Sequence, residues 1–164
     1  MNNRIRIEGL RELTKALNDL PDRVAKNGLR AAVYAGAKVI RTEARRRAPV
    51  AKTLPRQGQP KPGTLRRAII MKHLREQSGR HRQAFAVTVR RGKKYRNQGK
   101  KKNLSQDAWY WHFIEFGTVK MVARPFLRPA FESKRLQAVT AIKDKLAERI
   151  KQEATRLASS PRKK

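Results

Sequence analysis

Two apolar clusters, separated by a glycine and closed by two prolines, constrain the fold of this chain more than any other feature. The first is Phe113-Ile114-Glu115-Phe116-Gly117-Thr118, and the second is Ala123-Arg124-Pro125-Phe126-Leu127-Arg128-Pro129-Ala130-Phe131. Proline fixes φ and lacks a backbone N–H, whereas glycine adopts backbone angles that other residues avoid. We therefore expect a rigid, aromatic and sharply bent segment, and we call residues 113–131 the elbow. Such a segment is typical of an assembly component rather than of an enzyme.

Helical periodicity marks three segments. Leucines recur at helical spacing from Leu10 to Leu20, just before Pro21. From Asp22 to Arg47 small and apolar residues form one stripe, and Pro49 ends that helix. Small residues on this stripe allow close approach of another backbone, from the sheet or from another subunit. Pro129 suits the first turn of a final helix, whose apolar face is predicted to include Leu136, Val139, Ile142, Leu146, Ile150, Ala154 and Leu157.

Three short segments are predicted to be strands. Residues Arg4 to Glu8 alternate polar and apolar side chains, and Thr64 to His73 and Ala84 to Arg90 read as two antiparallel strands. Asp107 to Phe116 is rich in aromatic residues, and its periodicity leaves strand and short helix both open. The expected fold class is α+β: a small antiparallel sheet packed against the long helix of the N-terminal half and the C-terminal helix. One domain should span residues 1–158, followed by a disordered basic tail at 159–164.

Positive charge is concentrated in the middle of the chain. The formal net charge is +30, and between Ala44 and Gln106 one acid, Glu76, faces twenty Lys and Arg residues. Two long basic loops are predicted there, at about 49–63 and 92–106. Such a field attracts polyanions, so nucleic acid or an acidic protein surface is the expected neighbour, although a solvated basic face is the simpler alternative. The candidate contact residues are Arg56, Lys61, Lys93, Lys94, Arg96, Lys100, Lys101 and Lys102.

Several kinds of site are not expected. The chain has no cysteine, which excludes disulfides and thiolate metal sites and favours a reducing cytoplasm or a particle assembled there. No segment has the length and apolarity of a signal peptide or a membrane span. His112 and Glu115 are three residues apart, as metal ligands or an acid–base pair can be, but no second pair accompanies them. We therefore predict no catalytic residues, no cofactor and no metal.

The elbow also carries a family resemblance. Glu115-Phe116-Gly117-Thr118 followed by residues 123–131 resembles the hallmark of the Hong Kong 97 gene-product-10-like tail components of tailed phages. A long Ala-rich helix ending in Ala48-Pro49-Val50, and the stretch Gly63-Thr64-Leu65-Arg66-Arg67-Ala68-Ile69, occur in the order typical of that family. In this chain the loop from Ala51 to Pro62 is longer than usual, and Gly63 and Thr64 are reversed. The resemblance spans roughly residues 5–157.

What the resemblance implies is a structural virion protein, assembled in the host cytoplasm and located at the neck or head-proximal end of the tail. It would form a homo-oligomeric ring, six-fold or a multiple of six. Its neighbours would be the portal, an adaptor or stopper, and tail-tube or terminator proteins. The basic loops would dock on acidic surfaces of those proteins or contact genomic DNA non-specifically. We favour docking, because a conduit for DNA should not hold its cargo.

Within the elbow we expect an assembly hinge. Its candidate residues are Glu115, Phe116, Gly117, Thr118, Arg124, Pro125, Phe126, Arg128 and Pro129. Phe116, Phe126 and Phe131 are expected in the core, and Glu115 is expected to pair with an arginine of the elbow or of a neighbouring subunit. The competing hypothesis is a non-specific nucleic-acid-binding protein of ribosomal or nucleoid type. Against it, aromatic residues that could stack on bases are scarce in the basic loops.

Overall fold

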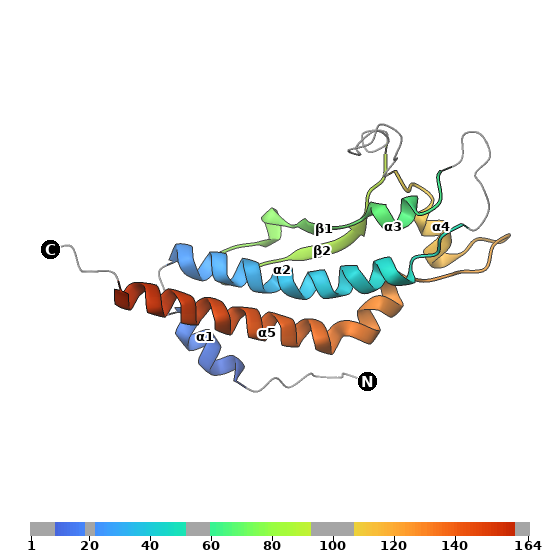
Figure 1. Ribbon diagram of the computed structural model, residues 1–164. Helices are drawn as coiled ribbons and strands as arrows, with labels where there is room; N and C mark the ends of the chain where they lie inside the picture. The colour runs from blue at the N-terminus through green and yellow to red at the C-terminus, as the bar shows by residue number, and fades with distance from the viewer. Residues whose placement is uncertain (1–8, 19–21, 52–59, 93–106, 160–164) are drawn as a thin grey trace.

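Two long antiparallel helices form the body of the protein. The computed structural model describes residues 9–18, 22–51, 60–92 and 107–159 (Figure 1). Helix α2 (Asp22–Arg47) lies along α5 (Leu127–Ser159), and α1 (Leu10–Asn18) packs beside them at one end. A two-stranded sheet, β1 (Ile69–His73) and β2 (Phe85–Val89), covers α2 on the side away from α5. The expected α+β class, with both long helices, is confirmed. The strand expected at Arg4–Glu8 lies outside the described residues. Of the tail expected at 159–164, Ser159 is the last residue of α5 and residues 160–164 lie outside the described residues.

Small side chains set the close approach of α2 to α5. Ala32 and Gly36 are buried on α2, and Ala138 is buried on the facing turn of α5. A Cβ added at Gly36 would lie 2.9 Å from the backbone oxygen of Ala138 and 2.6 Å from Ile142 Cγ1. The small-residue stripe was expected to meet the sheet or the same helix of another subunit, but at Gly36 its partner is α5 of the same chain. The face predicted for α5 was partly wrong, because Leu136 is 60% exposed and Ala138 occupies the buried position instead.

The sheet is antiparallel, as predicted, but its first strand begins later than expected. Ile69 pairs with Val89 and His73 with Phe85, and the connection between the strands holds a short 3-10 helix, η1 (Arg75–Gln77). Thr64–Ala68 forms the helical turn α3 rather than strand. Gly63, with φ of 76°, starts this turn, and the Thr64 hydroxyl donates to the Lys61 carbonyl oxygen at 2.7 Å. This geometry turns Leu65 and Ala68 together into the core.

The buried side chains fall into two clusters, one toward each end of the helical pair. At the elbow end Ala44, Leu65, Ile69, Val89 and Phe126 are buried together with neighbouring alanines. At the other end Ala25, Ala32 and Leu146 form a smaller cluster, against which Leu13, Leu29, Ile142 and Ile150 pack. Because the larger core lies directly beneath the elbow, the elbow's base is fixed by packing. Among the described helices, none has the length and apolar composition of a membrane span.

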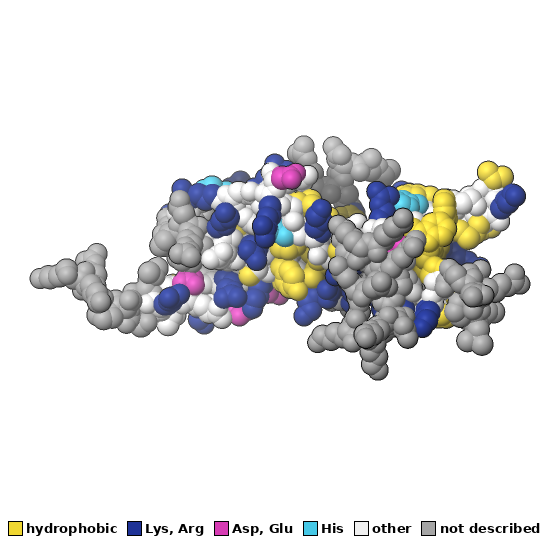
Figure 2. Space-filling model, turned by 90° about the horizontal axis from the view of Figure 1, so that it is seen from above, with side chains coloured by type: hydrophobic (Ala, Val, Ile, Leu, Met, Phe, Trp, Pro, Cys, Tyr) yellow, Lys and Arg dark blue, Asp and Glu magenta, His cyan; other side chains and the backbone are white. Residues whose placement is uncertain are grey.

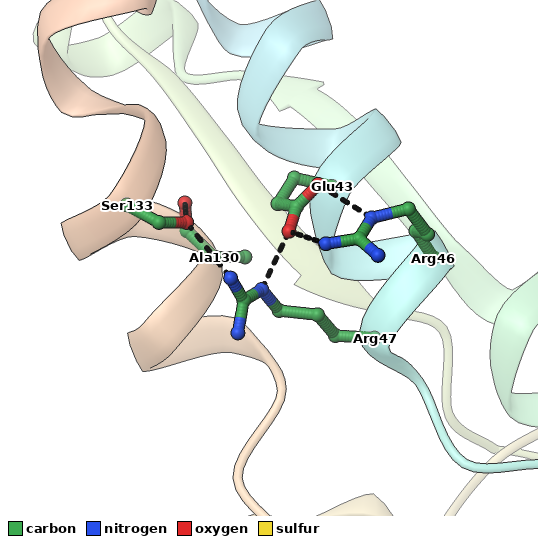
Figure 3. A network of polar contacts seen from close by, with 5 residues as sticks. All are labelled: Glu43, Arg46, Arg47, Ala130 and Ser133. Carbon is green, nitrogen blue, oxygen red and sulfur yellow. Dashed lines mark hydrogen bonds and ion pairs between the residues drawn. The ribbon is translucent and has the colours of Figure 1, made fainter.

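A buried carboxylate links α2 to the start of α5 (Figure 3). Glu43, 6% exposed, accepts hydrogen bonds from Arg46 Nε at 2.9 Å and Arg47 Nε at 2.6 Å. Arg47 Nη2 in turn donates to the hydroxyl of Ser133 at 3.2 Å. The hydrogen bond from Arg46, with the smaller contribution of Arg47, lowers the pKa of Glu43 to about 2. This network holds the first turns of α5 against the last turns of α2.

Candidate assembly surface

The aromatic segment before the bend is a short helix. Trp111–Phe116 forms α4, which decides between the strand and the helix that the sequence left open for this stretch. The helix ends at Gly117, whose φ of 78° lies in the left-handed region that favours glycine. A Cβ at Gly117 would lie 2.9 Å from both the nitrogen of Ala123 and the carbonyl oxygen of Met121. Both the backbone angle and the space therefore require glycine here.

After Gly117 the chain turns tightly and returns to α4. Thr118 and Met121 exchange two backbone hydrogen bonds, of 2.9 and 3.1 Å. The N–H of Arg124 then donates to the carbonyl oxygen of Ile114 at 2.8 Å, which closes the bend. Pro125 follows, and Pro129 lies in the first turn of α5. The sharp bend that the glycine and prolines predicted is therefore present, and Figure 1 shows this turn projecting beyond the end of the helical pair.

Glu115 locks the bend, but not through an arginine. Its buried carboxylate accepts three backbone N–H groups at the start of α5, from Phe126 at 2.8 Å and from Leu127 and Arg128 at 3.0 Å each. A carboxylate at a helix N-terminus satisfies donors that have no partner within the helix and interacts favourably with the helix dipole. The expected Arg–Glu115 pair was wrong, because backbone donors occupy the carboxylate. Arg128 instead pairs with Glu132 at 3.2 Å, on the exposed surface.

Of the three elbow phenylalanines expected in the core, Phe116, Phe126 and Phe131, only one lies there. Phe126 is fully buried, as expected, whereas Phe116 and Phe131 are 74% and 55% exposed, so the expectation for these two was wrong. In this chain their positions on α4 and α5 face outward. Because the sequence showed only that they are large and apolar, it gave no means to separate a core residue from a residue of an intermolecular surface.

Further apolar side chains are exposed around the bend. Val119 is fully exposed and Val122 is 84% exposed, and Figure 2 shows hydrophobic side chains gathered at this end of the molecule. Monomeric soluble proteins seldom expose large contiguous apolar patches. We call this surface the apolar end; its members are Trp109, Phe113, Phe116, Val119, Met121 and Val122.

Sequence reasoning passed over the residues of the turn itself. Val119, Met121 and Val122 lie in the short gap between the two apolar clusters and were not predicted as contacts. Their composition could have indicated a contact surface, because a tight turn normally carries polar residues and this one is mostly apolar. Here Lys120 is the sole charged side chain between Thr118 and Ala123.

The remaining hinge candidates lie on the surface of the elbow. Thr118, Arg124, Pro125 and Arg128 are all exposed, and Pro129 is half-buried. The predicted residues thus lie together in space, but only Glu115 and Phe126 are buried and hold the bend. The others are exposed or half-buried at its surface.

A groove of about 510 Å³ lies between the elbow and the two flanks of the first basic loop. Val50 and Pro60 line one side, and Tyr110, Met121 and Arg124 line the other. Burial raises the pKa of the Tyr110 hydroxyl. Lys61 also lines this groove and is exposed. The other seven basic candidates, Arg56, Lys93, Lys94, Arg96, Lys100, Lys101 and Lys102, lie outside the described residues.

His112 and Glu115 do not converge on a common point. The His112 ring stacks on Trp111 with centroids 4.0 Å apart, and its Nε2 lies 3.3 Å from Arg91 Nη1. Glu115 is turned the other way, toward α5. In the described part of the chain, no three His, Asp or Glu side chains gather as metal ligands would. The surface around the elbow therefore offers apolar contact and positive charge, which suit the binding of another macromolecule.

One family model matches this chain. The family is described as "Bacteriophage HK97-gp10, putative tail-component", and the match covers residues 11–117, well over half of the sequence. It runs from the first helix to Gly117, within the elbow. No curated protein and no solved structure matches the chain significantly.

Proposed function

Because the chain belongs to the HK97-gp10-like family of phage tail components, we propose that it forms a ring at the head–tail junction of a tailed phage. Family membership supports a structural role in the virion and contact with other virion proteins. We further propose that this ring lies between the DNA-filled capsid and the tail and has six-fold symmetry or a multiple of it. In this role the protein joins preformed parts and has no catalytic function.

The apolar end is the observation that supports this proposal most. Six large apolar side chains, each between 41% and 106% exposed, lie before α4, on it and on the turn after it, and the Glu115 carboxylate fixes that bend to the start of α5. Burying apolar surface is the main driving force of protein association. A preformed surface of this kind loses little conformational entropy when it binds, which favours stable assembly.

The basic residues suit a second kind of contact. A net charge of +30 speeds encounter with acidic surfaces and fixes register between preformed parts. Lys61 lies at the groove beside the elbow, at the edge of the first basic loop. We propose that this charge docks on acidic surfaces of the portal or tail proteins, and that contact with DNA is at most non-specific.

The direct test is the oligomeric state of the purified protein. At moderate salt we expect closed rings by negative-stain microscopy, and a mass by light scattering of six protomers or a multiple. A monomer that binds any DNA duplex, with an affinity that falls steeply as salt rises, would instead identify a non-specific nucleic-acid-binding protein.

The biological test is complementation of a phage that lacks this gene. The deletion should yield filled heads and separate tails, seen by electron microscopy, and the wild-type gene should restore joined virions. Val122→Asp, which places a charge on the apolar end, should fail to restore joining. Thr140→Asp, at an exposed position on α5, serves as the matched control and should complement. Normal virions from the deletion itself would contradict the proposed position.

A further inference from the structure

The protein carries two apolar surfaces at different places. The first is the tip of the elbow, which we define as Val119, Met121 and Val122. The second, the mid-helix groove, is a hollow of about 480 Å³ between α2, β2 and α5. Its lining is almost wholly apolar and includes Val33, Ile40, Phe85, Val87, Phe131 and Ile142. Figure 2 shows hydrophobic side chains both at the end of the molecule and midway along it.

The tip cannot reach the groove of its own chain. Hydrogen bonds from Arg124 to Ile114 and between Thr118 and Met121 fix the turn, and the turn points away from the helical pair (Figure 1). Tyr34, whose ring packs edge-on against Phe85 at 5.8 Å, marks the groove's position along α2. From Tyr34 to the end of α2 at Arg47 the helix is about 20 Å long, at 1.5 Å per residue. Any contact between tip and groove therefore joins two molecules.

We propose that the tip of one copy inserts into the mid-helix groove of the next copy. This inference rests on the proposed ring and names the two surfaces that would form its subunit contact. A contact between two different surfaces of the same protein is head-to-tail, and such contacts close into rings when the rotation permits. Contact between identical surfaces would instead stop at a dimer.

Charge also favours a second copy in this groove. Two chains of net charge +30 repel one another, so they can associate only where charge is sparse and apolar contact is extensive. The turn that carries the tip has one charged residue, Lys120, and among the described residues that line the groove Arg128 alone is charged. An acidic partner, in contrast, would gain most from the basic surfaces and least from these two apolar ones.

The test uses cysteine cross-linking, because the natural chain has no cysteine. Val119→Cys places a thiol on the tip, and Tyr34→Cys places one beside the groove, next to Phe85, where Tyr34 is 46% exposed. Under mild oxidation the double variant should give a ladder of covalent multimers on a denaturing gel. Mixing the two single variants should give covalent dimers and nothing larger. The matched control combines Val119→Cys with Lys26→Cys, an exposed site on α2 farther from the groove, and should give no ladder.

Three results would overturn the inference, and they are separable. Covalent dimers from Val119→Cys alone would show tip-to-tip contact. Rings in the microscope without cross-links between positions 119 and 34 would reject this subunit contact while keeping the proposed function. Protein that stays monomeric at every concentration would reject the ring as well. Circular dichroism and thermal melting of each variant would show that it folds as the wild type does.

Discussion

Replacing Glu115 by alanine removes the acceptor of three backbone N–H groups at the start of α5. The contacts are 2.8 to 3.0 Å long and the carboxylate is buried. Loss of a helix N-cap costs about 0.5–2 kcal/mol. Loss of a negative charge at the helix N-terminus adds about 0.3–2 kcal/mol. We therefore expect Glu115→Ala to lower the free energy of unfolding by about 1–4 kcal/mol.

Glu115→Gln should have a smaller effect. The amide oxygen can still accept from Phe126 and Leu127, but the amide nitrogen then faces the N–H of Arg128, so one donor is left without an acceptor. Its expected cost is about 1–2 kcal/mol. For a chain of this size each kcal/mol lowers Tm by roughly 2–4 °C.

The assay is urea unfolding followed by circular dichroism, with Glu132→Ala as the matched control. Glu132 lies one turn further along α5, and its ion pair with Arg128 is exposed, with side chains 60% and 83% accessible. Such pairs contribute about 0–1 kcal/mol. At a temperature where Glu115→Ala is still folded, it should also fail to form rings, because the elbow is no longer fixed. Equal unfolding free energies for Glu115→Ala and Glu132→Ala would contradict the role assigned to the Glu115 carboxylate.

Three further predictions concern the helical pair and the charge. Gly36→Ala should destabilise the protein by about 1–3 kcal/mol, since its Cβ would lie 2.9 Å from a backbone oxygen of α5. Gly28→Ala, whose Cβ would have only an ordinary contact at 3.7 Å, should be neutral or up to about 1 kcal/mol more stable. Urea unfolding of both variants measures this difference. Equal changes in unfolding free energy for the two variants would contradict the prediction. The pKa of Glu43 is lowered to about 2 from an ordinary value of 4.5, so its stabilising contribution is complete above pH 4.5 and is lost as pH falls toward 2. The difference in unfolding free energy between wild type and Glu43→Gln should therefore shrink over that range, and a constant difference would argue against the network. Charge reversal at Lys100, Lys101 and Lys102, which lie outside the described residues, should impair head–tail joining without lowering Tm; normal virion yield from that variant would exclude the docking role.

The main elements could be predicted from sequence because local rules determine them. Helix α2 runs from Asp22 to Arg47, as its small-residue stripe and Pro49 indicated. The bend at Gly117 was predicted from residue types alone, since few other sequences suit its backbone angle. The turn Thr64–Ala68 was missed because a short apolar run fits a strand and a buried helical turn equally well. Here the helical turn forms because it buries Leu65 in the core.

The candidate site could be predicted only in part, for a different physical reason. Glu115 was identified, but its partners are backbone N–H groups, which carry no sequence signal. The burial of Phe126 and the exposure of Phe116 depend on which face of α4 and α5 meets the core. A residue buried by another subunit has the same composition signal as a core residue. For a protein that assembles, apolar sequence patterns therefore predict what must be covered, but not by which molecule.

Apolar and electrostatic contacts respond differently to salt, so one basic chain can use both kinds and an experiment can separate them. Apolar contact weakens little with salt, whereas attraction between +30 protomers and acidic partners is screened within about 8–10 Å at physiological ionic strength. Screening also reduces repulsion between copies, so rising salt should favour rings and disfavour docking. If both contacts were electrostatic, they would respond to salt in the same direction. Opposite salt dependence of ring formation and partner binding is thus the expected signature of an apolar subunit contact combined with a basic docking surface.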